Sequence, residues 1–161
     1  DYAIHIAISP TKNADRIEWF VEKSVELGIN EITLLKCEHT EREHVKLDRL
    51  HKMAISAMKQ SLKARLPIIH PLTTFQNIIL ASHVEKYIAH VDNENPDHLR
   101  DIVKAGSSYL VLIGPEGDFS NEELRSAEAN AFKKVSLGPS RLRTETAGLA
   151  ACHILNLANT P

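Results

Sequence analysis

The sequence predicts an α/β domain with a mostly parallel sheet and helices on both faces. Short segments rich in isoleucine, leucine and valine alternate with segments of helical period along the whole chain. The 161 residues are 43% apolar and 25% charged, which is ordinary for a globular domain of this length. Because no internal repeat, low-complexity stretch or linker divides residues 1–161, we expect one domain.

The amino-terminal part predicts a strand, a helix and a second strand. Residues 2–9 are rich in isoleucine and are expected to be extended. From Ile17, apolar residues recur at helical spacing, and Gly28 is expected to end that helix. A second strand is expected at 31–37. The polar segment 38–46 is then expected to be an exposed, charged loop.

The middle of the chain predicts five shorter elements. In order, they are a helix at 47–63, a short strand bracketed by prolines at 67–71, a helix at 73–81, a strand at 86–91, and a helix at 97–105 that Gly106 ends. The apolar face of the first of these helices is expected at Leu50, Met53, Ala54, Ala57, Met58 and Ser61.

The carboxyl-terminal part contains two strands that each run into a glycine turn. The strand 109–113 enters the turn Gly-Pro-Glu-Gly-Asp, and a helix follows with a capping box made by Ser120 and Glu123. The second strand, 133–138, leads to a closing helix at 144–158. Thr144 is expected to cap this helix, and Glu145 lies in its first turn.

The first glycine turn indicates a ligand site without phosphate. Ligands of open α/β sheets bind beyond the carboxyl ends of strands, often on glycine turns. However, the dinucleotide and P-loop glycine motifs are absent, and Glu116 and Asp118 would repel a phosphate. A neutral or cationic ligand with hydroxyl groups fits these carboxylates better. Stabilisation of the helix start is an equally good explanation on local physics alone.

The second glycine turn strengthens the ligand interpretation. Arg141 and Arg143 lie at its mouth, where guanidinium groups can hold a phosphate or a planar base. The alternative for both is a solvated rim or an ion pair with Glu145. Small residues along 147–151 allow another backbone to approach the closing helix closely. Two such turns close together in the sequence favour a binding site.

Composition excludes several other classes. No apolar segment approaches the length of a membrane helix, and residues 1–10 do not resemble a signal peptide. Cys37 and Cys152 match no metal spacing and are expected to be reduced thiols of a cytoplasmic protein. The nine histidines are scattered without metal-site spacing, so no metal is expected. A net charge of −2 leaves room only for a local basic patch.

Two motifs carry a resemblance to a known family. The stretches LIGPEGDFSNEE (112–123) and SLGPSRLRTETA (136–147) resemble the RsmE family of ribosomal RNA methyltransferases, in the SPOUT superfamily. Residues 15–32 and 58–71 are also similar to sequences of that family, so the resemblance covers nearly the whole chain. Within residues 1–161 we expect no counterpart of the N-terminal RNA-binding β-barrel domain that members of the family usually have. Ser140 replaces a common arginine, and Lys59 replaces a common glutamate.

The resemblance implies a fold, a cofactor and a partner. It implies a carboxyl-terminal trefoil knot, S-adenosylmethionine (SAM) bound in the knot, and a homodimer whose interface lies against that site. SAM carries no phosphate, bears a sulfonium and offers ribose hydroxyls, in agreement with the carboxylates of the first turn. The cofactor-binding residues implied are Leu112, Ile113, Gly114, Pro115, Glu116, Gly117, Leu137, Gly138, Leu142, Arg143 and Thr144.

The activity implied is methylation of N3 of a uridine in small-subunit ribosomal RNA, free or in the assembled subunit. A cation near the uracil oxygens favours the anionic base, and Arg143 is expected in this role. Glu145 is expected to orient that arginine or accept the proton. RNA is expected to contact Arg141, Arg42, Lys59, Lys63 and Arg65, and by the same basic pattern Lys46. For each of these residues apart from Arg141, an ordinary solvated surface position is an equally good explanation.

Two other hypotheses remain open at the level of sequence. One is a nucleotide-binding α/β domain, which the missing phosphate motifs disfavour. The other is a non-catalytic RNA-binding or dimerisation module with the same fold. The filled arginine and threonine positions of the second motif argue against it.

Overall fold

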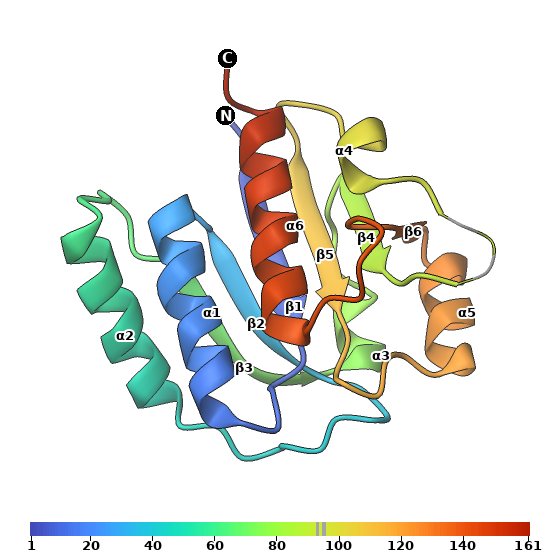
Figure 1. The fold of residues 1–161 in the computed structure, drawn as a ribbon, viewed down its shortest axis with the longest axis horizontal. Helices are drawn as coiled ribbons and strands as arrows, with labels where there is room; N and C mark the ends of the chain where they lie inside the picture. The colour runs from blue at the N-terminus through green and yellow to red at the C-terminus, as the bar shows by residue number, and fades with distance from the viewer. Residues whose placement is uncertain (93, 95) are drawn as a thin grey trace.

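Six strands form the centre of the fold in the computed structural model, which describes residues 1–92, 94 and 96–161 (Figure 1). They are β1 (Ala3–Ile8), β2 (Glu31–Lys36), β3 (Ile68–Thr74), β4 (Glu85–Ala89), β5 (Ser108–Ile113) and β6 (Lys133–Val135). Their order is β3-β2-β1-β5-β4-β6, and each neighbouring pair is parallel. The predicted parallel α/β class is confirmed.

Helices cover both faces of this sheet. On one face α1 (Ala14–Leu27) packs between α2 (Leu47–Gln60) and α6 (Thr144–Ala158), as Figure 1 shows. The other face is covered by α3 (Phe75–Ile78) and α5 (Asn121–Ala129). A single turn, α4 (Leu99–Ile102), packs beside α6. None of these helices, in the part of the chain that is described, is long and apolar enough to cross a membrane.

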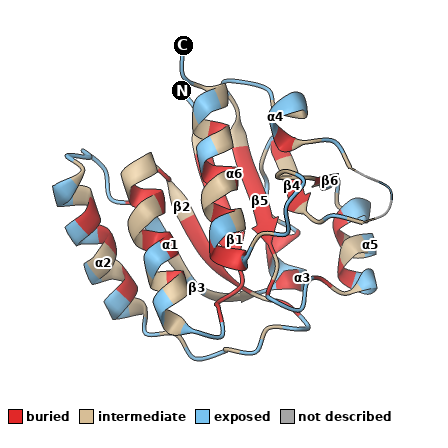
Figure 2. Cartoon of the chain, in the orientation of Figure 1, coloured by how far each residue is buried: buried red, intermediate tan, exposed pale blue. Residues whose placement is uncertain are grey.

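Two apolar cores follow from the two-residue period of the strands. Ile4, Ile6 and Ile8 of β1 face α1 and α6, whereas Ala7 faces α3 and α5. In β5, odd and even positions divide between the two cores in the same way. Because the central strands are buried on both faces, they are nearly continuously apolar, and Figure 2 shows buried residues concentrated there.

Helix α6 approaches the sheet unusually closely at Gly148. A Cβ placed on Gly148 would lie 2.7 Å from Phe20 Cε2 and 2.9 Å from Ile8 Cδ1. Both neighbours are fully buried. The absence of a side chain at Gly148 therefore sets how closely α6 packs on α1 and β1.

Two local signals are confirmed, the stop at Gly28 and the capping box at Ser120, whereas Gly106 does not end the helix before it, because α4 ends at Ile102. Gly28 ends α1 in the left-handed region, with φ of 93°. Ser120 accepts a hydrogen bond from the Glu123 amide at 3.2 Å, and the Ser120 amide donates to Glu123 Oε1 at 2.9 Å. Both motifs act within a few residues, so the sequence suffices to identify them.

Other boundaries differ from the prediction. The short strand expected at 67–71 continues through Pro71, because β3 is an edge strand and its register against β2 shifts at this point. Thr73 and Thr74 pair with β2, so the helix expected at 73–81 is reduced to α3. The helix expected at 97–105 is reduced to α4, because Val103 is extended.

Candidate functional site

The two glycine turns meet at the carboxyl edge of the sheet. The first follows β5 and spans 114–118, and the second lies between β6 and α6. Thr144 Oγ1 donates a hydrogen bond of 2.9 Å to the carbonyl oxygen of Gly114, which ties the turns together. The expectation that Thr144 caps α6 is wrong, because the N-cap residue is Arg143 and the Thr144 hydroxyl is committed to Gly114.

A cavity of about 670 Å³ opens between the turns. This volume lies within the range of small-molecule sites. Most of the residues expected to bind a cofactor line it, namely Ile113, Gly114, Pro115, Glu116, Leu137, Gly138, Leu142, Arg143 and Thr144. Arg141, which was expected to contact RNA, also lines it.

Two expected cofactor-binding residues lie elsewhere. Leu112 is fully buried in the core beneath α3 and α5. Gly117 lies outside the lining, with its carbonyl oxygen 3.2 Å from His39 Nδ1. Because strand residues alternate between faces, only one of two successive residues at the end of β5 can face the cavity.

Glu116 anchors a neighbouring loop as well as lining the cavity. The backbone amide of Lys12 donates to Glu116 Oε1 at 3.0 Å. Arg42 in turn donates to the Lys12 carbonyl oxygen from Nε at 3.1 Å and from Nη2 at 2.9 Å. The Arg42 guanidinium therefore lies beside the cavity, at the carboxyl edge of the sheet, and holds the loop 10–13.

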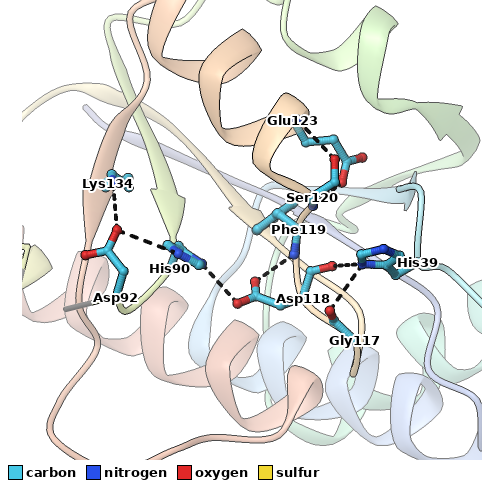
Figure 3. A network of polar contacts seen from close by, with 9 residues as sticks. All are labelled: His39, His90, Asp92, Gly117, Asp118, Phe119, Ser120, Glu123 and Lys134. Carbon is cyan, nitrogen blue, oxygen red and sulfur yellow. Dashed lines mark hydrogen bonds and ion pairs between the residues drawn. The ribbon is translucent and has the colours of Figure 1, made fainter. Parts of the chain in front are cut away.

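Asp118 and His90 form a polar pair in the cavity lining that the sequence analysis missed (Figure 3). His90 Nδ1 lies 3.0 Å from Asp118 Oδ2, so that nitrogen carries the hydrogen. His90 Nε2 lies 3.8 Å from Asp92 Oδ2, and Lys134 Nζ lies 2.6 Å from the same oxygen. The hydrogen bond from Lys134 lowers the pKa of Asp92. In the sequence, the only indication that His90 belongs to the site was that the strand expected at 86–91 ends at this edge of the sheet.

The backbone of Asp118 is held in a conformation that few non-glycine residues adopt, with φ of 66°. Its carbonyl oxygen lies 3.1 Å from His39 Nδ1, and its Oδ1 accepts from the Phe119 amide at 2.7 Å. These contacts hold the residue in place and leave Oδ2 directed toward His90 (Figure 3).

Glu145 does not pair with Arg143, although it was expected to orient that arginine. Arg141 and Arg143 are exposed, and neither forms an ion pair with the described residues. Glu145 instead accepts from Arg16 Nη1 of α1 at 3.1 Å, and its side chain is only 10% exposed. It lies outside the cavity lining. The two guanidinium groups in the cavity lining are therefore not paired with any carboxylate of the described residues.

The basic residues expected to contact RNA divide between two ends of the sheet. Lys59 is in the last turn of α2, and Lys63 and Arg65 follow it, near the amino end of β3. Lys63 Nζ would lie 3.9 Å from a Cβ at Gly28, the carboxyl end of α1. Figure 1 shows this end of α2 opposite the edge where the strands terminate. Arg42, Arg141 and Arg143 stand at the cavity's edge, and Lys46, the N-cap residue of α2, lies at the opposite end of that helix from Lys59.

A second polar cluster lies apart from the cavity. His5, Glu31 and His70 hold one ligand atom each within 4.8 Å of one another, which is compatible with a metal ion. Burial lowers the pKa of His5 to about 4, against the opposing effect of Glu31. Its imidazole is thus neutral near pH 7. The fold brings together histidines that are scattered in sequence.

Comparisons with known proteins agree on the family. The model of the RNA methyltransferase domain family matches residues 1–156. The ribosomal RNA small subunit methyltransferase E of Rickettsia conorii is 31% identical over 143 residues, which are 85% of this chain and 57% of that protein. The Bacillus subtilis protein of the same name is 27% identical, over 92% of this chain and 63% of its own length. The chain thus spans less than two thirds of these relatives.

Solved structures give the same result at the level of the fold. A "probable rRNA-methyltransferase" of Porphyromonas gingivalis matches with a TM-score of 0.93 and 46% identity, over 98% of this chain and 68% of its own. The ribosomal RNA small subunit methyltransferase E of Neisseria gonorrhoeae, bound to S-adenosyl methionine, matches with a TM-score of 0.89 and 29% identity, over 98% and 67%.

Proposed function

Because the chain belongs to the RNA methyltransferase domain family, we propose that it methylates N3 of a uridine in small-subunit ribosomal RNA, using SAM. The observation that carries this proposal is the cavity between the two glycine turns. The relatives named for small-subunit RNA methylation, and the Neisseria structure with its bound cofactor, support the substrate and cofactor classes.

The cavity suits SAM in size and in chemistry. A Cβ at Gly138 would meet no atom within 4 Å, so this wall leaves space for a ligand against the backbone. Leu137, Leu142 and Ala147 offer apolar contacts for an adenine ring. Glu116 keeps one carboxylate oxygen beyond its bond to Lys12, and that oxygen can accept from ribose hydroxyls. When bound, SAM supplies an electrophilic methyl group on a sulfonium.

The two arginines at the mouth are placed to receive RNA. Arg143 occupies the N-cap position of α6 without a side-chain capping bond, and it lines the cavity. Its guanidinium can therefore reach a uracil carbonyl oxygen and stabilise negative charge on the base. Arg141 stands beside it and can hold a flanking phosphate. Positioning of N3 in line with the methyl group is expected to provide much of the rate.

We assign the proton acceptor to Asp118 rather than to Glu145. Uracil N3 carries a hydrogen that must leave during methylation. Asp118 lines the cavity and its side chain is 52% exposed, whereas Glu145 is paired with Arg16 outside the lining. The bond from His90 Nδ1 orients the Asp118 carboxylate, so His90 is a positioning residue in this scheme. The ion pair with Arg16 holds the Glu145 side chain in the first turn of α6.

Three further features belong to the same proposal: a trefoil knot, a homodimer and a cytoplasmic location. The knot is supported by the path after β6. Ser136 bonds to Asp97 and Leu99 at 2.9 Å each, and the chain then returns to Gly114 at the end of β5. A homodimer could place a partner's basic surface near this cavity. Residues 1–161 on their own are expected to bind RNA more weakly than a full-length relative.

Calorimetric titration of SAM tests the proposal, with NADH as the control ligand. We expect about one equivalent of SAM per chain and no NADH binding. Gly138→Arg should abolish SAM binding by filling the cavity wall. Gly106→Arg is the matched control, because Gly106 also has positive φ and open space around it but lies outside the cavity lining. Equal SAM binding by both variants would place the cofactor elsewhere.

Methyl transfer is tested on isolated small subunits and on their RNA, with detection of N3-methyluridine after digestion. Transfer that requires SAM and is lost in Gly138→Arg supports the activity. RNA binding without SAM binding by the folded chain would instead favour the non-catalytic module. NADH binding would favour the nucleotide-binding domain.

A further inference from the structure

The second polar cluster lies on the sheet face that carries α3 and α5, near the strands' amino ends. Ala7 and Leu35 belong to the core on that face. The two-residue period therefore places His5 of β1 and Glu31 of β2 on the same face. His70 comes from β3, and His83 lies in the segment between α3 and β4. Four elements thus converge on one point, away from the cavity at the opposite edge.

The distances within the cluster match those around one metal ion. His70 Nε2 lies 2.9 Å from Glu31 Oε2, and His5 Nδ1 lies 3.9 Å from the same oxygen. His83 Nε2 lies 3.2 Å from His5 Nδ1. Ligand atoms bound tetrahedrally at about 2.0–2.1 Å from zinc are separated by about 3.4 Å. The cluster needs only small side-chain adjustments to reach that geometry.

An outer contact orients the most buried ligand. His5 Nε2 lies 2.7 Å from Thr33 Oγ1. When Nε2–H donates to this hydroxyl, Nδ1 presents its lone pair toward Glu31 and His83. Ligating histidines commonly have their second nitrogen held in this way. His83 Nδ1 is buried and has no hydrogen-bond partner among the described residues, so the polar contact of its ring is the one that Nε2 makes with His5.

We propose that His5, Glu31 and His70, with His83 as an additional ligand, bind a divalent transition ion of the class to which Zn²⁺ belongs. Two or three imidazoles and one carboxylate suit such ions, whereas Mg²⁺ and Ca²⁺ prefer oxygen ligands. The ion joins β1, β2 and β3 to the segment before β4. The alternative is a cluster held by hydrogen bonds only.

Zinc titration of the tag-free chain tests this site, with a chromophoric chelator as competitor and Co²⁺ absorption as a probe of tetrahedral geometry. The variants are Glu31→Gln and His70→Ala, whose side chains are 35% and 40% exposed, so both are expected to fold. His153→Ala is the matched control, because His153 is exposed on α6. Melting in EDTA checks that all variants fold equally well.

We expect one Zn²⁺ per chain, a rise in melting temperature with Zn²⁺ but not with Mg²⁺, and affinity weakened at least about tenfold in both cluster variants. His153→Ala should bind as the wild type does. Absence of zinc binding, or wild-type zinc affinity in both Glu31→Gln and His70→Ala, overturns the site. SAM binding should be unchanged in His70→Ala, so this test and the test of the proposed function can fail independently.

Discussion

Removal of the hydroxyl of Thr144 should loosen the junction between the two glycine turns. Thr144→Val keeps the side-chain shape but deletes the donor of the 2.9 Å hydrogen bond to Gly114. Thr144 is 5% exposed, so water cannot replace the hydroxyl easily. A lost hydrogen bond that leaves a buried carbonyl unsatisfied costs about 1–3 kcal/mol. Gly114 is half-buried, so we expect the lower part of that range, about 1–2 kcal/mol.

Urea unfolding at fixed protein concentration measures this loss. For a domain of this size, about 1–2 kcal/mol corresponds to a fall in melting temperature of roughly 2–8 °C. If this hydrogen bond stabilises the SAM-binding form of the cavity by the same free energy, its loss should raise the Kd for SAM roughly fivefold to thirtyfold. Thr144→Ser keeps the donor and should behave nearly as the wild type does.

Thr146→Val provides the matched control, because Thr146 is exposed two residues further along α6. It should change neither the free energy of unfolding nor the Kd for SAM. If Thr144→Val and Thr146→Val were indistinguishable in both measurements, the hydrogen bond to Gly114 would not hold the turns together.

Three further substitutions test the packing and the site. Gly148→Ala should destabilise the fold by about 1–2 kcal/mol in urea unfolding, because overpacking against Phe20 exceeds the gain in helix propensity; a more stable variant would contradict this packing. Arg143→Ala should lower the kcat of methyl transfer while leaving the Kd for SAM within about threefold, and Arg125→Ala, an exposed change on α5, should leave both unchanged; an equal kcat loss in both would argue against a specific role. Asp118→Asn, which tolerates the same backbone, should lower kcat about 100-fold if Asp118 accepts the proton, and an unchanged kcat would remove it from that role.

The parts of the fold that the sequence predicts well depend on neighbouring residues. Gly28 ends α1, and Ser120 with Glu123 starts α5, since each motif is complete within one helical turn. The strand at 67–71 was misjudged because the tolerance for Pro71 depends on an edge position and a register shift, which only the assembled sheet defines.

The site was predictable to the extent that its residues follow strand ends in the two motifs. Most of those residues line one cavity in the structure, and their role in binding a cofactor stays a prediction. In contrast, the pairing of Glu145 with Arg16, and of His90 with Asp118, joins residues from distant parts of the chain. No local pattern records such contacts, because the packing of α1 against α6 and the position of β4 beside β5 create them.

The pairing of β1 with β5 has a consequence for how the chain is made. Ala3 pairs with Ser108, so the centre of the sheet joins two segments that lie far apart in the sequence. At typical synthesis rates, roughly 5–20 s pass between the emergence of these two residues. Meanwhile β1 can pair with β2 and be covered by α1, but its other edge has no partner. That isoleucine-rich edge is therefore exposed to aggregation while the chain is made, and α6, which follows β5 in the sequence, closes the cavity only after that edge is paired.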